Sequence, residues 1–154
     1  MPEDIVGRIL RLPGYGAYET IFDEESQTIR LRVRQVGFKP RYTCGGCGID
    51  VTDVHDLSER TVRDLPWGGW RVFLIVEIHR VRCRRCGVKT ERLSFLDGKH
   101  PYTRRFAAAV ARDCEDAPVR RVAARWGLGE QTARRMDNSQ LWRRWMAALL
   151  RPAL

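Results

Sequence analysis

The sequence predicts an α+β fold in which a strand-rich part comes first and a helical part follows. Apolar residues alternate with arginines in residues 28–36, and residues 72–76 form an unbroken apolar run, so both segments are typical of strands. After Pro101 the apolar residues recur at helical spacing instead. Because strands and helices are segregated along the chain, we expect two small modules rather than an α/β sandwich.

The first forty residues are expected to form a short helix and a β-hairpin. Apolar residues recur at helical spacing in residues 4–12, where Asp4 is a candidate cap. Strands are predicted at 18–22 and 28–36, joined by a turn at 24–27. The second strand should bury its apolar side and expose its arginines.

The middle of the chain is expected to contain a second pair of strands. A short strand is predicted at 61–65 and a turn at 66–69. Residues 70–81 form the strongest strand of the sequence, and its centre is apolar on both faces.

Three helices are expected after Pro101. The first covers residues 102–115, whose apolar positions repeat every four residues. Pro118 suits the first turn of a second helix, which Gly127 ends. Residues 130–150 contain neither proline nor glycine and predict a long third helix.

The net charge of the chain is +9, and it is unevenly distributed. Residues 1–29 carry −4, residues 30–98 carry +6 and residues 99–154 carry +7. This basic excess, almost all of it arginine, indicates a polyanionic partner for the second and third segments. No apolar run approaches the roughly 20 residues of a membrane helix, and the acidic start is followed by no signal-peptide core. We therefore expect a cytoplasmic, nucleoid-associated protein without a membrane partner.

Four of the five cysteines form two Cys-x-x-Cys pairs, each followed by glycine; they are Cys44, Cys47, Cys83 and Cys86. Such a turn directs two thiolates at one metal ion, and four thiolates suit tetrahedral zinc. Two of these knuckles on hairpins make a zinc ribbon, with the 35 residues between them packed on it. We predict one structural zinc per chain, because four thiolates leave no open position for water.

Two disulfides or a redox pair are the alternatives for these cysteines. A cytosolic chain keeps its thiols reduced, and the βαβ context of a thioredoxin-like motif is missing. Cys114 lies on the apolar side of the 102–115 helix and is expected to be a buried structural cysteine. The histidines are not needed as ligands, and His79 is expected to line a sheet face; they are His55, His79 and His100.

Residues 119–138 match the pattern of a helix-turn-helix. Ala123 is the small residue at the helix crossing, and Gly127 takes the turn. Five apolar residues form the expected shared core: Val122, Trp126, Leu128, Ala133 and Met136. The alternative is a plain three-helix bundle whose arginines are only solvated.

Ten polar residues are the candidate contacts to double-stranded DNA. The start of the second helix of the motif would face base edges in the major groove, and the other arginines would reach phosphates. Base contacts are assigned to Glu130, Gln131, Thr132, Arg134 and Arg135, and phosphate contacts to Arg104, Arg105, Arg120, Arg121 and Arg125.

An apolar stripe follows the motif: Leu141, Trp142, Trp145, Met146 and Leu149. Packing against the ribbon or against a further domain is one interpretation. A homodimer interface through the C-terminal helix is the other.

The ordered set of motifs over residues 40–140 resembles the N-terminal part of transposases of the ISL-three family of bacterial insertion sequences. The resemblance rests on the two knuckles, Arg63-Asp64-Leu65-Pro66 with Gly68-Gly69, the strand running into Cys83, and the helix-turn-helix around Ala123–Leu128. The residue patterns divide this α+β chain into an N-terminal helix and hairpin (1–39), a zinc-ribbon-like module (40–98) and a three-helix helix-turn-helix module (99–154). The resemblance implies a zinc finger followed by a helix-turn-helix. It also implies a region that binds the terminal inverted repeats of a mobile element.

In the family, a ribonuclease-H-like domain with three acidic metal ligands follows this region. No such triad and no Ser/His or Cys/His set is evident here, so we expect neither strand transfer nor a small-molecule substrate for this chain alone. A truncated transposase, a decayed copy and an independent regulator derived from one fit equally well. A zinc-ribbon adaptor for RNA or protein is the competing hypothesis. An exposed aromatic platform of Trp67, Trp70 and Tyr42 would favour it, and packing of Trp67 and Trp70 over the ribbon core is the alternative.

Overall fold

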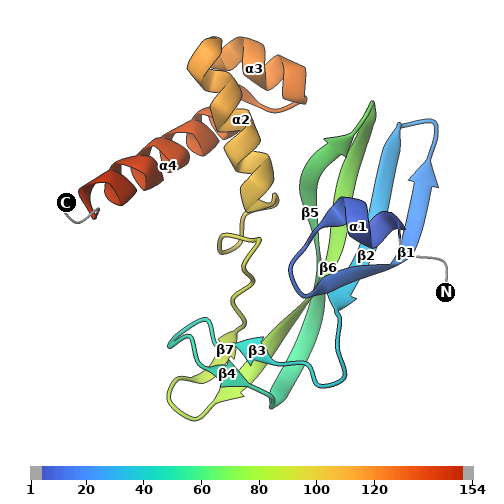
Figure 1. Cartoon of the computed structure of the whole chain (residues 1–154), viewed down its shortest axis with the longest axis vertical. Coiled ribbons are helices and arrows are strands. Elements are labelled where there is room, and N and C mark those ends of the chain that lie inside the picture. Colours follow the sequence, from blue (N-terminus) through green and yellow to red (C-terminus); the bar gives the residue numbers. More distant parts are fainter. Residues whose placement is uncertain (1–4, 151–154) are drawn as a thin grey trace. The chain divides into compact units, whose positions relative to one another are not determined.

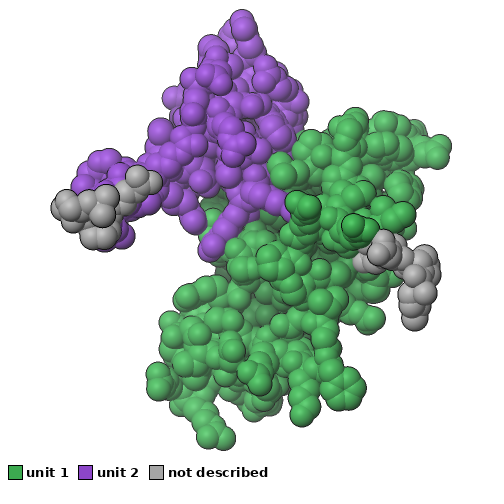
Figure 2. All heavy atoms as spheres, in the orientation of Figure 1, with its two compact units in different colours: residues 1–103 green, residues 104–154 purple. Residues whose placement is uncertain are grey.

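The computed structural model describes residues 5–150, and it divides the chain into two compact units after Thr103 (Figure 2). Unit 1 is rich in strands and unit 2 is helical, so the predicted α+β class is confirmed (Figure 1). Asp4, the candidate helix cap, lies outside the described residues. No helix among the described residues is both long enough and apolar enough to cross a membrane.

Unit 1 contains one helix and seven strands in its described part. The elements are α1 (Ile5–Leu10), β1 (Tyr15–Asp23), β2 (Thr28–Gln35), β3 (Tyr42–Thr43), β4 (Asp50–Val51), β5 (Val54–Trp67), β6 (Trp70–Cys83) and β7 (Gly87–Thr90). The main sheet has the order β1-β2-β6-β5, with β7 paired to the end of β6, and β3 and β4 form a separate small hairpin (Figure 1).

The main sheet joins the N-terminal hairpin to the long β5–β6 hairpin. Strands β1 and β2 pair antiparallel around the predicted turn, and β5 and β6 also pair antiparallel. Strands β2 and β6 pair in parallel, from Thr28 opposite Arg71 to Val33 opposite Val76. The N-terminal hairpin and β6, which ends at Cys83, therefore share one sheet.

The core of unit 1 lies on one face of this sheet. Strand β2 buries its apolar residues and leaves Arg30 and Arg34 exposed, as its alternation predicts. The opposing layer comes from α1 and from the segment after β7; its residues are Leu10, Leu12, Leu93, Phe95 and Leu96. In β6 the prediction holds in part, because Val72, Leu74 and Val76 are buried whereas the other face is only half-buried.

Strand β5 is much longer than the predicted strand at 61–65. In its first half, residues 55–59 are exposed and include charged side chains, so this part lacks the apolar alternation that marks a strand. This part is a strand because it pairs with β6. Asp56 lies opposite Arg80 and forms an ion pair with it. The Oδ1 atom of Asp56 accepts a hydrogen bond of 2.8 Å from Nε of Arg80.

Unit 2 consists of α2 (Arg104–Asp116), α3 (Val119–Trp126) and α4 (Glu130–Leu149), which agree with the predicted helices within about two residues. Their core includes Phe106, Val110, Val122, Ala133 and Met136. The rings of Phe106 and Trp126 meet edge to face at a centroid distance of 5.3 Å.

The prediction that Cys114 is buried is wrong. It is half-buried in the last turn of α2, whereas the buried positions of this helix end at Ala111. Burial and the nearby carboxylates of Asp137 and Asp113 raise the pKa of its thiol. Helical spacing from Phe106 places Cys114 on the core side, but it does not show how far the neighbouring helices extend over it.

Candidate metal centre and nucleic-acid interface

The four paired cysteines lie at the tips of two hairpins in unit 1. Cys44 follows β3, and its backbone N–H donates to the carbonyl of Ile49 at 2.8 Å, which closes the first knuckle. Cys83 ends β6, and its partner across the β6–β7 hairpin is Gly87. Gly48 and Gly87 both adopt positive φ, at 79° and 74°, so a glycine after each Cys-x-x-Cys pair has a clear backbone reason.

The four sulfur atoms converge on one point. All four Sγ atoms lie within 4.8 Å of one another, and Sγ of Cys47 and Sγ of Cys83 are 3.6 Å apart. Tetrahedral zinc with Zn–S bonds of about 2.3 Å requires sulfur separations of about 3.8 Å. The donor set therefore fits Zn²⁺. The predicted ligands Cys44, Cys47, Cys83 and Cys86 come together, with no further ligand among the described residues.

The electrostatics of the four thiols also favour a bound cation. The backbone N–H groups of Cys47 and Gly46 point at Cys44 and lower the pKa of its thiol to about 6. The thiols cannot all ionise together: hydrogen bonding to Cys47 and burial raise the pKa of Cys86 to about 12. A divalent ion supplies the positive charge that four adjacent thiolates need.

Two glycines inside the first knuckle allow the hairpins to approach. A Cβ atom on Gly46 would lie 2.9 Å from Sγ of Cys86, and one on Gly45 would collide with the carbonyl oxygen of Thr90. The N–H of Gly45 donates to that same oxygen at 3.1 Å. The first knuckle and β7 are therefore in direct backbone contact.

Gly45→Ala is expected to destabilise the ribbon by about 1–3 kcal/mol, because the added methyl group forces the two hairpins apart. Thermal unfolding of the zinc-loaded chain measures this loss. Gly69→Ala is the matched control, since a Cβ atom there meets nothing within 4 Å and the backbone φ is not positive. Equal melting temperatures for the two variants would contradict the close contact at Gly45.

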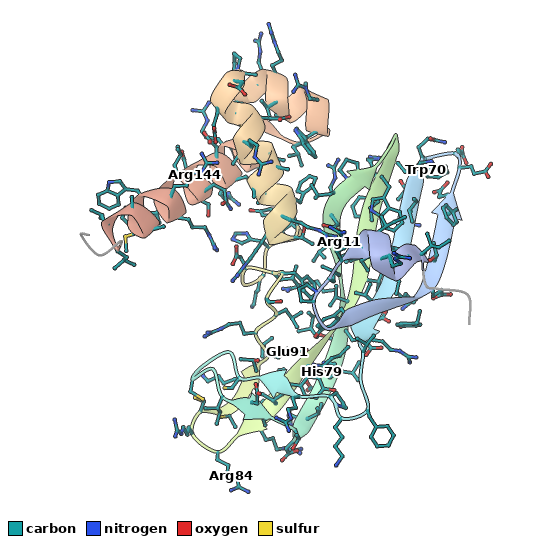
Figure 3. The ribbon with its side chains drawn as sticks, in the orientation of Figure 1. Arg11, Trp70, His79, Arg84, Glu91 and Arg144 are labelled. Carbon is teal, nitrogen blue, oxygen red and sulfur yellow. The ribbon has the colours of Figure 1, made fainter. Side chains whose placement is uncertain are left out.

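A buried polar pair lies beside the ribbon, which sequence reasoning did not find. The carboxylate of Glu91 accepts from the backbone N–H of His79 at 2.8 Å and lies 2.7 Å from its Nδ1 atom (Figure 3). The ring of Tyr42 packs on the imidazole with a centroid distance of 4.3 Å. His79 lines the sheet as expected, and only the spatial pairing of β6 with the segment after β7 brings Glu91 to it.

The turn between α3 and α4 has the expected glycine geometry. Gly127 ends α3 in the left-handed region at φ 61°, and its N–H reaches the carbonyls of Ala123 and Ala124. Leu128 N–H then donates to the Ala123 carbonyl at 2.8 Å. Ala123 itself is buried, as a small residue at a helix crossing should be.

Asp113 of α2 fastens the end of α3. Its Oδ2 atom accepts from Nε1 of Trp126 at 2.8 Å and from Nη1 of Arg125 at 3.2 Å. Arg125 is therefore an ion-paired residue, a role that the sequence did not indicate.

The candidate DNA contacts mostly lie on exposed surface of unit 2. On α3 and α4 the exposed ones are Arg120, Arg121, Arg125, Glu130, Gln131, Arg134 and Arg135, whereas Thr132, Arg104 and Arg105 are half-buried. Arg134 and Glu130 form an i,i+4 ion pair at 2.9 Å. At about 100° per residue, Glu130, Gln131, Arg134 and Arg135 share the side of α4 opposite the buried Ala133 and Met136.

The comparisons with known proteins fall on these two regions. Residues 40–86 match the family described as the zinc-finger of transposase IS204/IS1001/IS1096/IS1165, and residues 91–141 match the helix-turn-helix domain of transposase family ISL3. The chain is also 32% identical over 132 residues to the transposase for insertion sequence element IS1001 of Bordetella parapertussis. The chain therefore contains the zinc-finger and helix-turn-helix segments of ISL3-family transposases. No solved structure matches it significantly.

The alignment with the IS1001 transposase covers 83% of the chain but only 32% of that relative. The two family models match a zinc-finger segment and a helix-turn-helix segment of the chain. The family match and the sulfur cluster together support a structural zinc held by the four cysteines.

Proposed function

We propose that this chain recognises a specific duplex DNA sequence, the terminal inverted repeat of an insertion sequence, through unit 2. The observation that carries the proposal is the helix-turn-helix match over residues 91–141, which includes α2, α3 and the first half of α4. The outward side of that half carries Gln131, Arg134 and Arg135, the side-chain types that bind adenine and guanine edges bidentately.

In this proposal the first turns of α4 enter the major groove. Gln131 and Arg134 contact base edges, and Glu130 holds the guanidinium of Arg134 in place through their ion pair. Arg120 and Arg121 of α3 contact phosphates. Arg104, Arg105 and Arg125 contribute further phosphate contacts, although Arg104 and Arg105 are half-buried and Arg125 is paired with Asp113. The chain thereby supplies DNA binding to transposition, at the nucleoid and in the cytoplasm.

The ribbon has a scaffolding role in this proposal. When bound, zinc supplies a fixed tetrahedral junction for the four thiolates. Cys44, Cys47, Cys83 and Cys86 hold the two hairpins, and the long β6 connects that junction to the sheet core.

The adaptor alternative finds no support in unit 1. An exposed aromatic platform of Trp67, Trp70 and Tyr42 would have favoured it. Instead Tyr42 is buried against His79, while Trp67 and Trp70 pack against the sheet core.

A selection of bound fragments from random duplex DNA tests the proposal. Recovery of one defined motif by the zinc-loaded chain supports sequence-specific binding. Salt-sensitive binding that enriches no motif would contradict it, because phosphate contacts alone carry no sequence information.

The second half of α4 is proposed to form a homodimer. Its apolar stripe is exposed, with Trp142 at 61% and Trp145 at 54%, and the rings of these two stack at 5.1 Å. The stripe continues the outward side of α4, so one side of the helix is polar near Gly127 and apolar near its end.

Trp145→Glu is expected to convert a dimer to a monomer, because it places a charge in the centre of the apolar stripe. Sedimentation over a range of concentrations measures the change, and Ser139→Glu on the same helix is the control. A wild-type chain that stays monomeric at roughly 100 µM would contradict the proposal.

A further inference from the structure

Unit 1 contains a pocket that neither the zinc site nor the proposed DNA contacts use. Its volume is about 760 Å³, within the range of ligand-binding clefts. The walls come from the first half of β5, the facing part of β6 and the segment after β7. The apolar part of its lining consists of Leu57, Ile78, Leu93 and Leu96, and Leu57 is 57% exposed.

Arg60 is the unusual residue of this pocket. Its neighbour across the strand pair is Val76, so it lies on the same face of the sheet as the core. Its Nε atom is buried and has no hydrogen-bond partner among residues 5–150. Burial alone lowers the pKa of its guanidinium. A buried donor without an acceptor is costly, and a ligand with an anionic oxygen would remove that cost.

The other charges of the pocket are arranged around Arg60 in two groups. The acids have their own partners: Asp56 pairs with Arg80, Glu59 with Arg32 and Glu91 with His79. Lys99 is exposed and has no acid partner in the described part of the chain. The guanidinium of Arg92 donates to the carbonyl of Gly45 and pairs with no acid among the same residues. Arg60, Arg92 and Lys99 are therefore the cations that a ligand could neutralise.

The free edge of β5 runs along this pocket. Strand β5 ends the sheet order, and beyond the contact of Arg63 with Pro101 and Thr103 its outer edge has no backbone partner at residues 55–61 in the described chain. An extended peptide can add to such an edge and direct alternate side chains to one side.

We propose that this pocket and the edge of β5 bind an extended protein segment in which apolar and carboxylate side chains alternate on one face. The apolar side chains would cover Leu57, Leu93 and Leu96, and a carboxylate would accept from Arg60. Nucleic acid fits less well. Four cations face three acids here, which gives little net attraction for phosphates, and the lining residues include no aromatic ring for an unpaired base.

The test uses the full zinc-loaded chain and a labelled heptapeptide, Leu-Ser-Glu-Ser-Leu-Ser-Glu, whose odd positions share one face. Fluorescence anisotropy is expected to give a Kd in the range of about 10–100 µM. The same peptide with both Glu changed to Gln, and the Arg60→Gln and Lys99→Gln variants, should each bind about tenfold more weakly. Arg30→Gln, on the exposed side of β2, should bind as the wild type does.

Equal binding of the Glu and Gln peptides would overturn the proposal, as would absence of binding at roughly 1 mM. Displacement of the peptide by a short DNA duplex, retained in a chain that carries both Arg121→Ala and Arg134→Ala, would also overturn it and assign the pocket to nucleic acid. Zinc content and thermal unfolding of Arg60→Gln show that the variant is folded. Because Lys99 is exposed, the peptide affinity of Lys99→Gln tests the proposal in a variant whose fold is not at risk.

Discussion

Replacing Cys83 with serine is expected to abolish stoichiometric zinc binding and to unfold the ribbon end of unit 1. Structural zinc contributes about 10–16 kcal/mol to the folding of zinc-finger peptides, and three thiolates cannot complete the tetrahedral donor set. Cys83 also ends β6, so losing it frees β7 and the first knuckle from the sheet. Atomic emission on the purified chain should fall from one zinc per molecule to about a tenth of that or less.

The matched control is Cys114→Ser, because Cys114 lies in the last turn of α2 in the other unit. This variant should retain one zinc per chain. With the metal removed, the wild-type chain should titrate one thiol more than Cys114→Ser and refold its ribbon when zinc is restored. A wild-type chain purified without metal, with all its thiols free and its ribbon folded, would contradict the structural role of zinc.

The second large effect is expected at the start of α4. Arg134→Ala should lower affinity for the selected DNA motif by about 1–3 kcal/mol while leaving nonspecific binding almost unchanged, because a base contact is lost. Arg121→Ala removes a phosphate contact instead. It should weaken specific and nonspecific binding alike and reduce the salt slope by about one.

Neither substitution should unfold the protein. Arg121 and Arg134 are exposed, and the ion pair of Arg134 with Glu130 is worth only about 0.3–0.5 kcal/mol. Thermal unfolding serves as the control for both variants. If both retain wild-type affinity on every duplex, the outward side of α4 is not the DNA-binding surface.

Local patterns in the sequence predicted the features that depend on neighbouring residues. The spacing of Cys44, Cys47, Cys83 and Cys86 specified the sulfur cluster, since a Cys-x-x-Cys turn followed by glycine has few backbone solutions. Gly127 likewise specified the turn between α3 and α4, because only glycine takes its left-handed conformation without strain.

Features that depend on distant pairing could not be predicted in this way. Nothing in the periodicity of β2 selects β6 as its parallel neighbour, because that choice depends on how two separate hairpins pack. Residues 54–60 look like a charged loop until the pairing of Asp56 with Arg80 is known. The contact of His79 with Glu91 and the buried, unpaired Nε atom of Arg60 also depend on these long-range pairings.

The most direct test of the account is the ratio of two dissociation constants for the zinc-loaded chain. One is measured on a duplex that carries the selected motif and the other on a scrambled duplex of equal length, both at the same salt concentration near 150 mM. Sequence-specific recognition through unit 2 predicts a ratio of about 10³ or more. A ratio near one, with both affinities falling in parallel as salt increases, would contradict the claim that this chain reads a DNA sequence.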